Sequence, residues 1–121
     1  QGVEDWQPPQ PAFRERVYYH EKLKMDSDGQ TEVRIHNPHF PLLGEQAGRS
    51  VTVRLAWEVQ NLPELVQWQM PAEGMHVLGI EPANCRVGGR AAERVRGTLV
   101  TLAPGQSVEY RLQFSVSEDI L

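Results

Sequence analysis

The chain has 121 residues, a mass of 13.7 kDa and a formal net charge of −4. A monomer of this mass exposes roughly 6,600 Å² of the roughly 20,000 Å² in its extended chain, so residues 1–121 are expected to fold as one domain. The acidic balance argues against a nucleic-acid partner, and no run approaches the roughly 18 apolar residues of a membrane span. The single cysteine, Cys85, excludes an internal disulfide and favours a reducing compartment such as the cytoplasm.

Residues 1–13 are predicted to form an extended arm. The three prolines of this segment lack the N–H donor that a helix or a central strand needs, and they hold φ at about −65°. Trp6 and Phe13 are large apolar side chains within the arm. Their presence indicates that the arm lies across a surface of the domain.

Beyond the arm, apolar and polar residues alternate. In the clearest run, residues 108–116, polar or charged residues separate Tyr110, Leu112 and Phe114. Side chains on a strand point to opposite faces in turn, so each such run has one buried and one solvated face, as in antiparallel sheets. Seven strands are predicted, at residues 16–23, 32–37, 51–59, 65–70, 76–81, 98–102 and 108–116. We therefore predict an all-β fold, an antiparallel β-sandwich.

Turn signals separate these strands. Residues 26–29 (DSDG) and the Pro104-Gly105 pair supply residues that tolerate the backbone of a tight turn. Residues 61–63 (NLP) separate the third predicted strand from the fourth. One short helix is predicted, at residues 90–96, with Gly97 as its stop signal.

Glu81 is the first candidate for chemistry. It ends the mostly apolar strand 76–81, and Pro82 holds its backbone extended. A carboxylate at the rim of an apolar sheet is expected to be partly desolvated, which suits a general base. The alternative is an ordinary strand-end glutamate, in water or paired with an arginine.

Four arginines follow this strand within one loop and helix: Arg86, Arg90, Arg94 and Arg96. A guanidinium group presents a planar fork that suits carboxylates, phosphates and vicinal oxygens, so Arg86 and Arg90 are candidates for substrate binding. The alternative is a solvated helix face with Glu93 as its ion-pair partner.

The histidines offer no metal site. His36 and His39 are spaced as HxxH, but in an extended or turning segment this spacing does not place both rings on one metal. His20, on the opposite strand face from Tyr19 and Glu21, is a candidate for moving a proton near neutral pH. The alternative is a surface histidine or a hydrogen-bonded core histidine.

Trp68 and Gln67 are candidates for sugar binding. A flat aromatic ring can stack on a sugar face while a neighbouring amide binds hydroxyl groups. The alternative is a core tryptophan, because Trp68 has the same strand parity as Val66 and Met70. We expect no cofactor.

Several segments resemble one known family. The C-terminal part of the aldose 1-epimerase-like, or galactose mutarotase-like, family is similar to residues 62–70 (LPELVQWQM), 77–85 (VLGIEPANC), 89–94 (GRAAER) and 102–105 (LAPG). The chain looks closest to an uncharacterised branch of that superfamily, a domain of unknown function. Residues 5–10 (DWQPPQ) and 17–21 (VYYHE) also resemble this branch, so the resemblance spans nearly the whole chain.

The resemblance implies a large antiparallel supersandwich that binds a sugar on a concave sheet face, of which this chain is one part. The family's mutarotases use a glutamate to take the proton from the anomeric hydroxyl and a histidine to protonate the ring oxygen. Glu81 is similar in position to that glutamate, and His20 falls in a segment where the family often contacts substrate. The family's acid histidine lies in an earlier part that this chain does not contain.

Two functions follow as hypotheses. The first is the C-terminal part of an aldose 1-epimerase-like protein that binds a sugar or sugar derivative, with Glu81 and His20 as catalytic residues. The second is a non-catalytic carbohydrate-binding or oligomerising β-sandwich module. Because a partial sandwich leaves strand edges and an apolar face uncovered, we expect a homo-oligomer or a missing N-terminal half that covers them.

Overall fold

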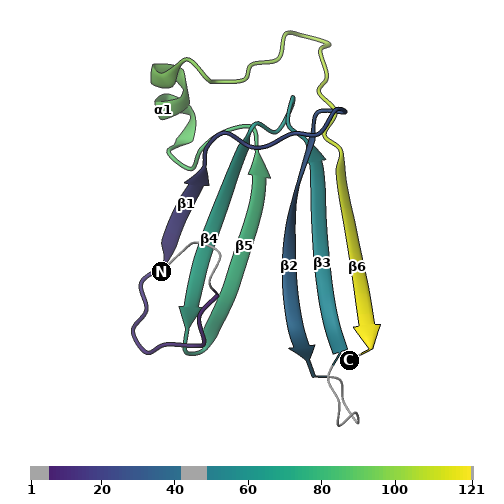
Figure 1. Ribbon diagram of the computed structural model, residues 1–121. Helices are drawn as coiled ribbons and strands as arrows, with labels where there is room; N and C mark the ends of the chain where they lie inside the picture. The colour runs from purple at the N-terminus through teal and green to yellow at the C-terminus, as the bar shows by residue number, and fades with distance from the viewer. Residues whose placement is uncertain (1–5, 42–48, 121) are drawn as a thin grey trace.

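The computed structural model describes residues 6–41 and 49–120, and this part of the chain contains six strands and one helix (Figure 1). The strands are β1 (Arg16–His20), β2 (Gln30–Phe40), β3 (Arg49–Glu58), β4 (Glu64–Ala72), β5 (Met75–Ala83) and β6 (Leu112–Ile120), and the helix is α1 (Gly89–Arg96). None of the described helical structure has the length and apolarity needed to cross a membrane.

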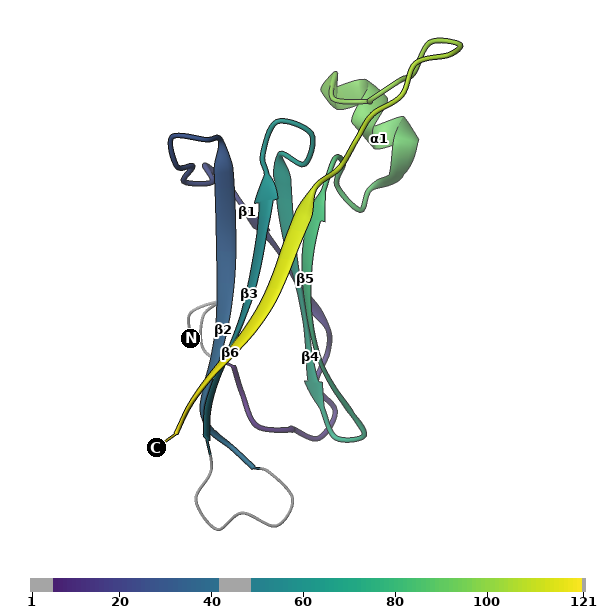
Figure 2. The same ribbon diagram turned by 90° about the vertical axis from the view of Figure 1, so that its right-hand side faces the viewer.

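The strands form two antiparallel sheets, in the orders β1-β4-β5 and β2-β3-β6. The chain changes sheet after β1, after β3 and after β5, so neither sheet forms from one continuous stretch of sequence. Figures 1 and 2 show that the sheets lie closest at the end where β3 leads into β4 and diverge towards the other end. The predicted all-β antiparallel sandwich with one short helix is confirmed.

The core lies at the end where the sheets meet. Its centre is formed by Trp57 of β3, Leu62 of the β3–β4 connection and Leu65 of β4. The partly buried residues around them are Leu23, Val33, Leu55 and Ile80. Trp57 is 1% exposed, and its Nε1 donates a 3.1 Å hydrogen bond to the carbonyl of Leu62. Because Leu62 lies in the connection between the sheets, the Trp57 ring and this hydrogen bond join one sheet to the other.

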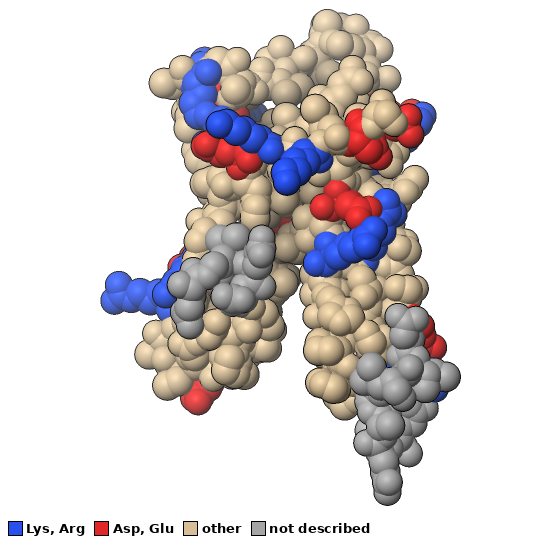
Figure 3. Space-filling model, in the orientation of Figure 1, with Lys and Arg blue, Asp and Glu red and all other residues tan. Residues whose placement is uncertain are grey.

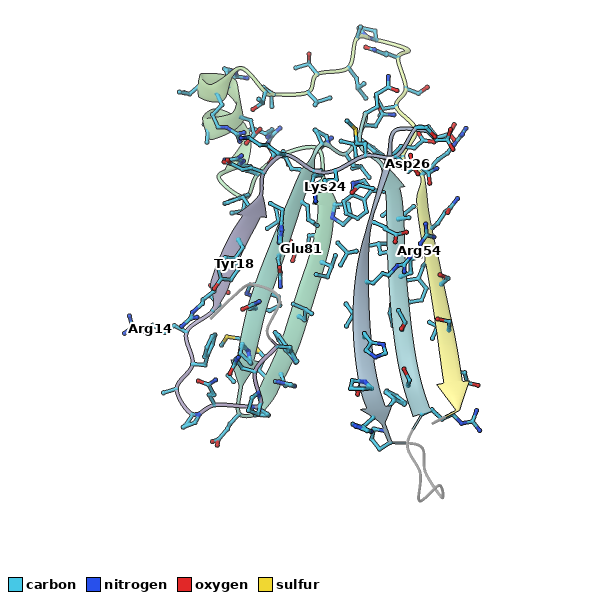
Figure 4. The ribbon with its side chains drawn as sticks, in the orientation of Figure 1. Arg14, Tyr18, Lys24, Asp26, Arg54 and Glu81 are labelled. Carbon is cyan, nitrogen blue, oxygen red and sulfur yellow. The ribbon has the colours of Figure 1, made fainter. Side chains whose placement is uncertain are left out.

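The turn signals form the expected turns. Gly29 adopts a left-handed φ of 74° and donates a 3.2 Å hydrogen bond to the carbonyl of Asp26. The Asp26 carboxylate, labelled in Figure 4 near the start of β2, accepts hydrogen bonds from the amides of Asp28 and Gln30, both at 2.9 Å. Gly105 likewise has a φ of 80° in the Pro104-Gly105 turn.

Three strand predictions need correction. Residues 98–102 are not a strand, because the chain here crosses from α1 towards β6 of the other sheet and no neighbouring strand supplies a hydrogen-bonding partner. For the same reason the last strand begins only at Leu112, where pairing with β3 starts. The first strand ends at His20 because Lys22 takes a left-handed φ of 57°, which breaks the extended backbone.

The described part of the arm packs against the end of the β1-β4-β5 sheet where β4 leads into β5, and residues 1–5 lie outside the described residues. The arm is not extended throughout, because the chain turns at Pro11-Ala12, where Ala12 has a φ of 54°. Trp6 packs against the ring of His76, with 4.9 Å between the ring centroids. The Gln10 amide donates to the carbonyl of Pro71 at 2.9 Å, and the Glu73 amide donates to the carbonyl of Gln10 at 3.0 Å. These bonds hold the arm along the end of β4.

We expect the Trp57→Phe variant to lower the free energy of unfolding by about 2 kcal/mol, because the smaller ring leaves a void and the buried Leu62 carbonyl loses its donor. Urea unfolding at one fixed protein concentration measures the change. Trp6→Phe is the matched control, since Trp6 is exposed, and we expect it to cost less than about 0.5 kcal/mol. Equal effects of the two variants would show that the core does not centre on Trp57.

Candidate functional site

The β1-β4-β5 sheet has two faces with different chemistry. In antiparallel strands, residues directly opposite one another share a face, and Tyr19, Val66 and Glu81 lie opposite one another across β1, β4 and β5. Their strand neighbours His20 and Gln67 lie on the other face. We call the face that carries His20 and Gln67 the inner face, because it is turned towards the second sheet, and the face that carries Glu81 the outer face.

A cavity of about 680 Å³ lies between the diverging sheets. Its walls include His20, Leu65, Gln67, Leu78 and Ile80 from the inner face, and Thr31, Val33 and Ile35 from β2. Figure 3 shows the molecule hollowed between the two sheets, with most charged side chains of this view near the end where the sheets meet. His20 Nε2 lies 2.8 Å from Gln67 Oε1, within hydrogen-bond distance. The structure therefore brings His20 and Gln67 together, as a polar pair in an extension of the core.

Glu81 does not line this cavity. Figure 4 labels Glu81 on β5, and strand parity places its side chain on the outer face, where it is exposed. The expected partial desolvation is therefore wrong, and the reason is that the apolar residues of β5, Leu78 and Ile80, point to the opposite face. His20 and Glu81 are on opposite faces of one sheet and do not share a site.

Gly79 makes room for the Glu81 carboxylate. A Cβ atom added at Gly79 would lie 2.5 Å from Glu81 Oε1 and 3.2 Å from the Cβ of Trp68. The carboxylate therefore folds back along β5 and lies over Gly79, next to Trp68. Glu81 and Trp68, two residues singled out in the sequence, are neighbours on the outer face.

The indole ring of Trp68 is held by a residue of the segment that precedes β1. Its Nε1 donates a 2.8 Å hydrogen bond to Glu15 Oε2, just before β1. Trp68 is only half-buried, so it is not the core tryptophan of the alternative reading. That role belongs to Trp57, which is on the other sheet.

Arg86 is engaged in ion pairs on the same outer face. Its guanidinium lies 4.8 Å above the centre of the Tyr19 ring, a cation–π contact. The Arg86 Nε donates a hydrogen bond to Glu64 Oε2 at 3.1 Å, and Arg86 Nη2 lies 3.8 Å from Glu21 Oε1. Arg86 therefore positions Tyr19 and neutralises Glu64, and is less free to hold a substrate than the sequence suggested.

The helix is tied to this ion cluster by Glu93, which is 2% exposed. Glu93 Oε1 accepts hydrogen bonds from Arg96 Nη1 at 2.7 Å and from the Arg86 amide at 3.2 Å, and Glu93 Oε2 accepts one from Thr98 Oγ1 at 2.7 Å. The hydrogen bond from Thr98, together with the Arg86 amide and the charge of Arg96, outweighs burial and lowers the pKa of Glu93. Arg96 also pairs with Glu64 of β4 at 3.1 Å, so α1 is fastened to the sheet.

Arg90 lies apart from these groups. It is exposed on α1, and neither its position nor any described contact joins it to Glu81 or Trp68. The sequence alternative, in which Glu93 pairs with a helix arginine, holds for Arg96. That pair is partly buried, however, and is not on a solvated helix face.

Sequence reasoning missed Tyr19 and Gly79 as parts of the outer face. Strand parity already separated Tyr19 from His20, but parity alone does not say which face meets the second sheet. The role of Gly79 depends on where the Glu81 carboxylate lies in the folded chain, which strand parity does not determine. Among the described residues, no group of three or more histidine, cysteine or acidic side chains is placed to hold a metal, and His36 instead contacts Thr52.

The fold and this face define a class of protein: an antiparallel β-sandwich whose outer sheet face carries a carboxylate, two aromatic rings and an ion cluster. A family model described as a domain of unknown function (DUF4432) matches residues 1–116, and the chain belongs to this family. No curated protein and no solved structure matches the chain.

We expect Glu93→Gln to destabilise the fold at pH 7 and to have a smaller effect in acid. A carboxyl group whose pKa is lower in the folded state stabilises the fold above its unfolded value, about 4.5, and this contribution is lost as the pH falls through the folded pKa. Thermal unfolding at pH 7 and at pH 3 measures the difference between variant and wild type. Glu73→Gln, at an exposed turn, is the control; a Glu93→Gln effect independent of pH would contradict the ion cluster.

Proposed function

We propose that this chain binds a sugar or sugar derivative on the outer face of the β1-β4-β5 sheet, as part of an aldose 1-epimerase-like protein with Glu81 as its acid/base group. The outer face replaces the concave sheet face that the resemblance implies, because Glu81 does not line the cavity between the sheets. The observation that carries the proposal is the placement of the Glu81 carboxylate beside Trp68, on an exposed sheet face and in the same cross-strand row as Tyr19. The resemblance of residues 77–85 to the family's glutamate strand supports the same residue independently.

The outer face has the groups that sugar recognition needs. A sugar presents an apolar ring face and a belt of hydroxyl groups, which an aromatic ring and a few fixed polar groups match. Trp68 is held in one orientation by Glu15, and Tyr19 is held by Arg86. The Glu81 carboxylate accepts hydrogen bonds from hydroxyl groups, and these charge-assisted bonds are the stronger kind.

The spacing of the row suits a single sugar ring. Neighbouring strands lie about 4.8 Å apart, so Tyr19 and Glu81, two strands apart, have Cα atoms about 10 Å apart. Val66 lies between them and is 2% exposed, so the neighbouring side chains cover it. A sugar ring would therefore lie above this covered row, with the phenol on one side and the carboxylate on the other.

Interconversion of anomers needs a base and an acid on one face. The Glu81 carboxylate takes the proton of the anomeric hydroxyl while the Tyr19 phenol donates its proton to the ring oxygen, and the bond between that oxygen and the anomeric carbon breaks as the carbonyl forms. After rotation of the carbonyl, the ring oxygen returns its proton to Tyr19, attacks the other carbonyl face, and Glu81 protonates the new hydroxyl. Tyr19 takes the place of His20 in this scheme, because His20 lies on the inner face.

A non-catalytic carbohydrate-binding module is the second candidate. The exposure of Glu81 favours it, because a solvated carboxylate can bind hydroxyl groups without acting as a base. In both cases we propose that the protein acts in the cytoplasm without a cofactor, since the exposed free thiol of Cys85 suits a reducing compartment.

We expect neutral aldoses to quench or shift tryptophan fluorescence on titration, and Glu81→Gln to weaken the fitted affinity about tenfold, since hydrogen bonds to charged groups contribute about 1.5–3 kcal/mol and neutral ones about 1 kcal/mol. Glu73→Gln, a carboxylate in the β4–β5 turn of the same sheet, should bind as the wild type does. If no aldose, amino sugar or sugar acid binds the wild-type chain, the proposed function is wrong.

We expect the chain to accelerate anomer interconversion of the sugar that binds, and Glu81→Gln and Tyr19→Phe each to slow it by about 10²-fold or more, the usual contribution of a general acid or base. Polarimetry follows the reaction. Tyr18→Phe is the matched control, because Tyr18 is the next residue along β1 and has the opposite parity. Binding without acceleration would support the non-catalytic module and exclude the epimerase.

A further inference from the structure

The β2-β3-β6 sheet carries an uncovered apolar row on β6. Leu112, Phe114 and Val116 lie opposite Trp57, Leu55 and Val53 of β3, so they share the face that carries the core. The residues that alternate with them, Gln113 and Ser115, and the following Ser117 lie on the polar face. We call Leu112, Phe114 and Val116 the β6 stripe.

The stripe is open to solvent although it continues the core face. Its three side chains are 51%, 70% and 59% exposed, whereas Trp57 in the same row of the sheet is 1% exposed. The chain as a whole exposes 9175 Å², which is roughly 2,600 Å² more than a folded monomer of its mass. The β6 stripe contributes to this excess, together with the exposed residues 100–107 and the helix.

The free edge of β6 is equally unprotected. Among the described strands, β6 pairs with β3 alone, so the hydrogen-bonding groups of its other edge are open. Natural edge strands usually carry a lysine, a proline or a bulge that prevents pairing. The stretch from Leu112 to Ser117 contains no charged residue and no proline.

We propose that a second copy of this chain pairs with β6, antiparallel and about a twofold axis at Phe114. In this register Phe114 lies opposite the partner's Phe114, and Leu112 lies opposite the partner's Val116. Gln113 then faces the partner's Ser115, so apolar groups meet apolar groups on one face and polar groups meet polar groups on the other. The sequence of the stripe is thus self-complementary, as an isologous dimer requires.

Other registers fit less well. A shift by one residue places the stripe against polar side chains. A shift of the axis to Ser115 places Leu112 against the partner's Glu118, whose carboxylate is paired with Arg49 at 2.9 Å within its own sheet. A shift to Gln113 leaves only residues 112–114 of each strand paired, because β6 begins at Leu112.

Cysteine cross-linking in a Cys85→Ser background tests the register. Opposite Cα atoms in an antiparallel pair are about 4.5–5.5 Å apart, within the range of a disulfide, so Phe114→Cys should give a covalent dimer on mild oxidation. Leu112→Cys is the control. Its two copies would be four residues apart along the strands, about 13 Å, and should stay reduced. Equal cross-linking of both variants, or of neither, overturns the pairing.

Light scattering after size exclusion tests the association itself. We expect a mass of twice 13.7 kDa for the wild type and at least a tenfold weaker dimer for Phe114→Lys, whose exposed position keeps folding intact. Ser115→Lys, one residue along on the polar face, should remain dimeric. A wild-type monomer, or larger assemblies that Phe114→Lys leaves unchanged, would mean that another occupant covers the stripe, and would overturn the proposal.

Discussion

The junction around Trp57 is the interaction on which the arrangement of this domain depends. The chain changes sheet three times, so the two sheets need a contact that fixes one against the other. Trp57 supplies it, through its buried ring and its hydrogen bond to the Leu62 carbonyl in the connection between the sheets. The described core centres on this one end. Away from it the sheets diverge, which is why a cavity opens between them.

The sequence predicts the chemistry of each strand well and the partners of each strand poorly. Alternation with a period of two depends on neighbouring residues, so the all-β class, the turn at residues 26–29 and the helix near 90–96 were predictable. Pairing depends on residues far apart in the chain. Residues 98–102 have the composition of a strand but do not form one, because the fold places no strand edge beside them.

In the candidate site, too, local patterns were informative, whereas contacts between distant residues were not predictable. Glu81 and Trp68 were identified from local pattern and resemblance, and the structure makes them neighbours through Gly79. His20 was grouped with Glu81, although a shift of one residue along a strand moves a side chain to the other face. Tyr19, its neighbour, is on the face of Glu81. The ion pairs of Arg86 could not be predicted from the sequence either, because Arg86 lies in the loop after β5 and its partner Glu64 is on β4, 22 residues away.

The ion cluster explains how an exposed face can still hold side chains in place. An exposed carboxylate or phenol samples many rotamers, and ordering it for a ligand costs conformational entropy. Here the buried Glu93 carboxylate is paired with Arg96, and Arg96 also pairs with Glu64. Arg86, which pairs with Glu64 as well, lies over the Tyr19 ring. The buried Glu93 thus helps to hold the Tyr19 ring in place through this series of contacts. The β6 stripe belongs to the other sheet, so association there would leave Tyr19 and Glu81 accessible.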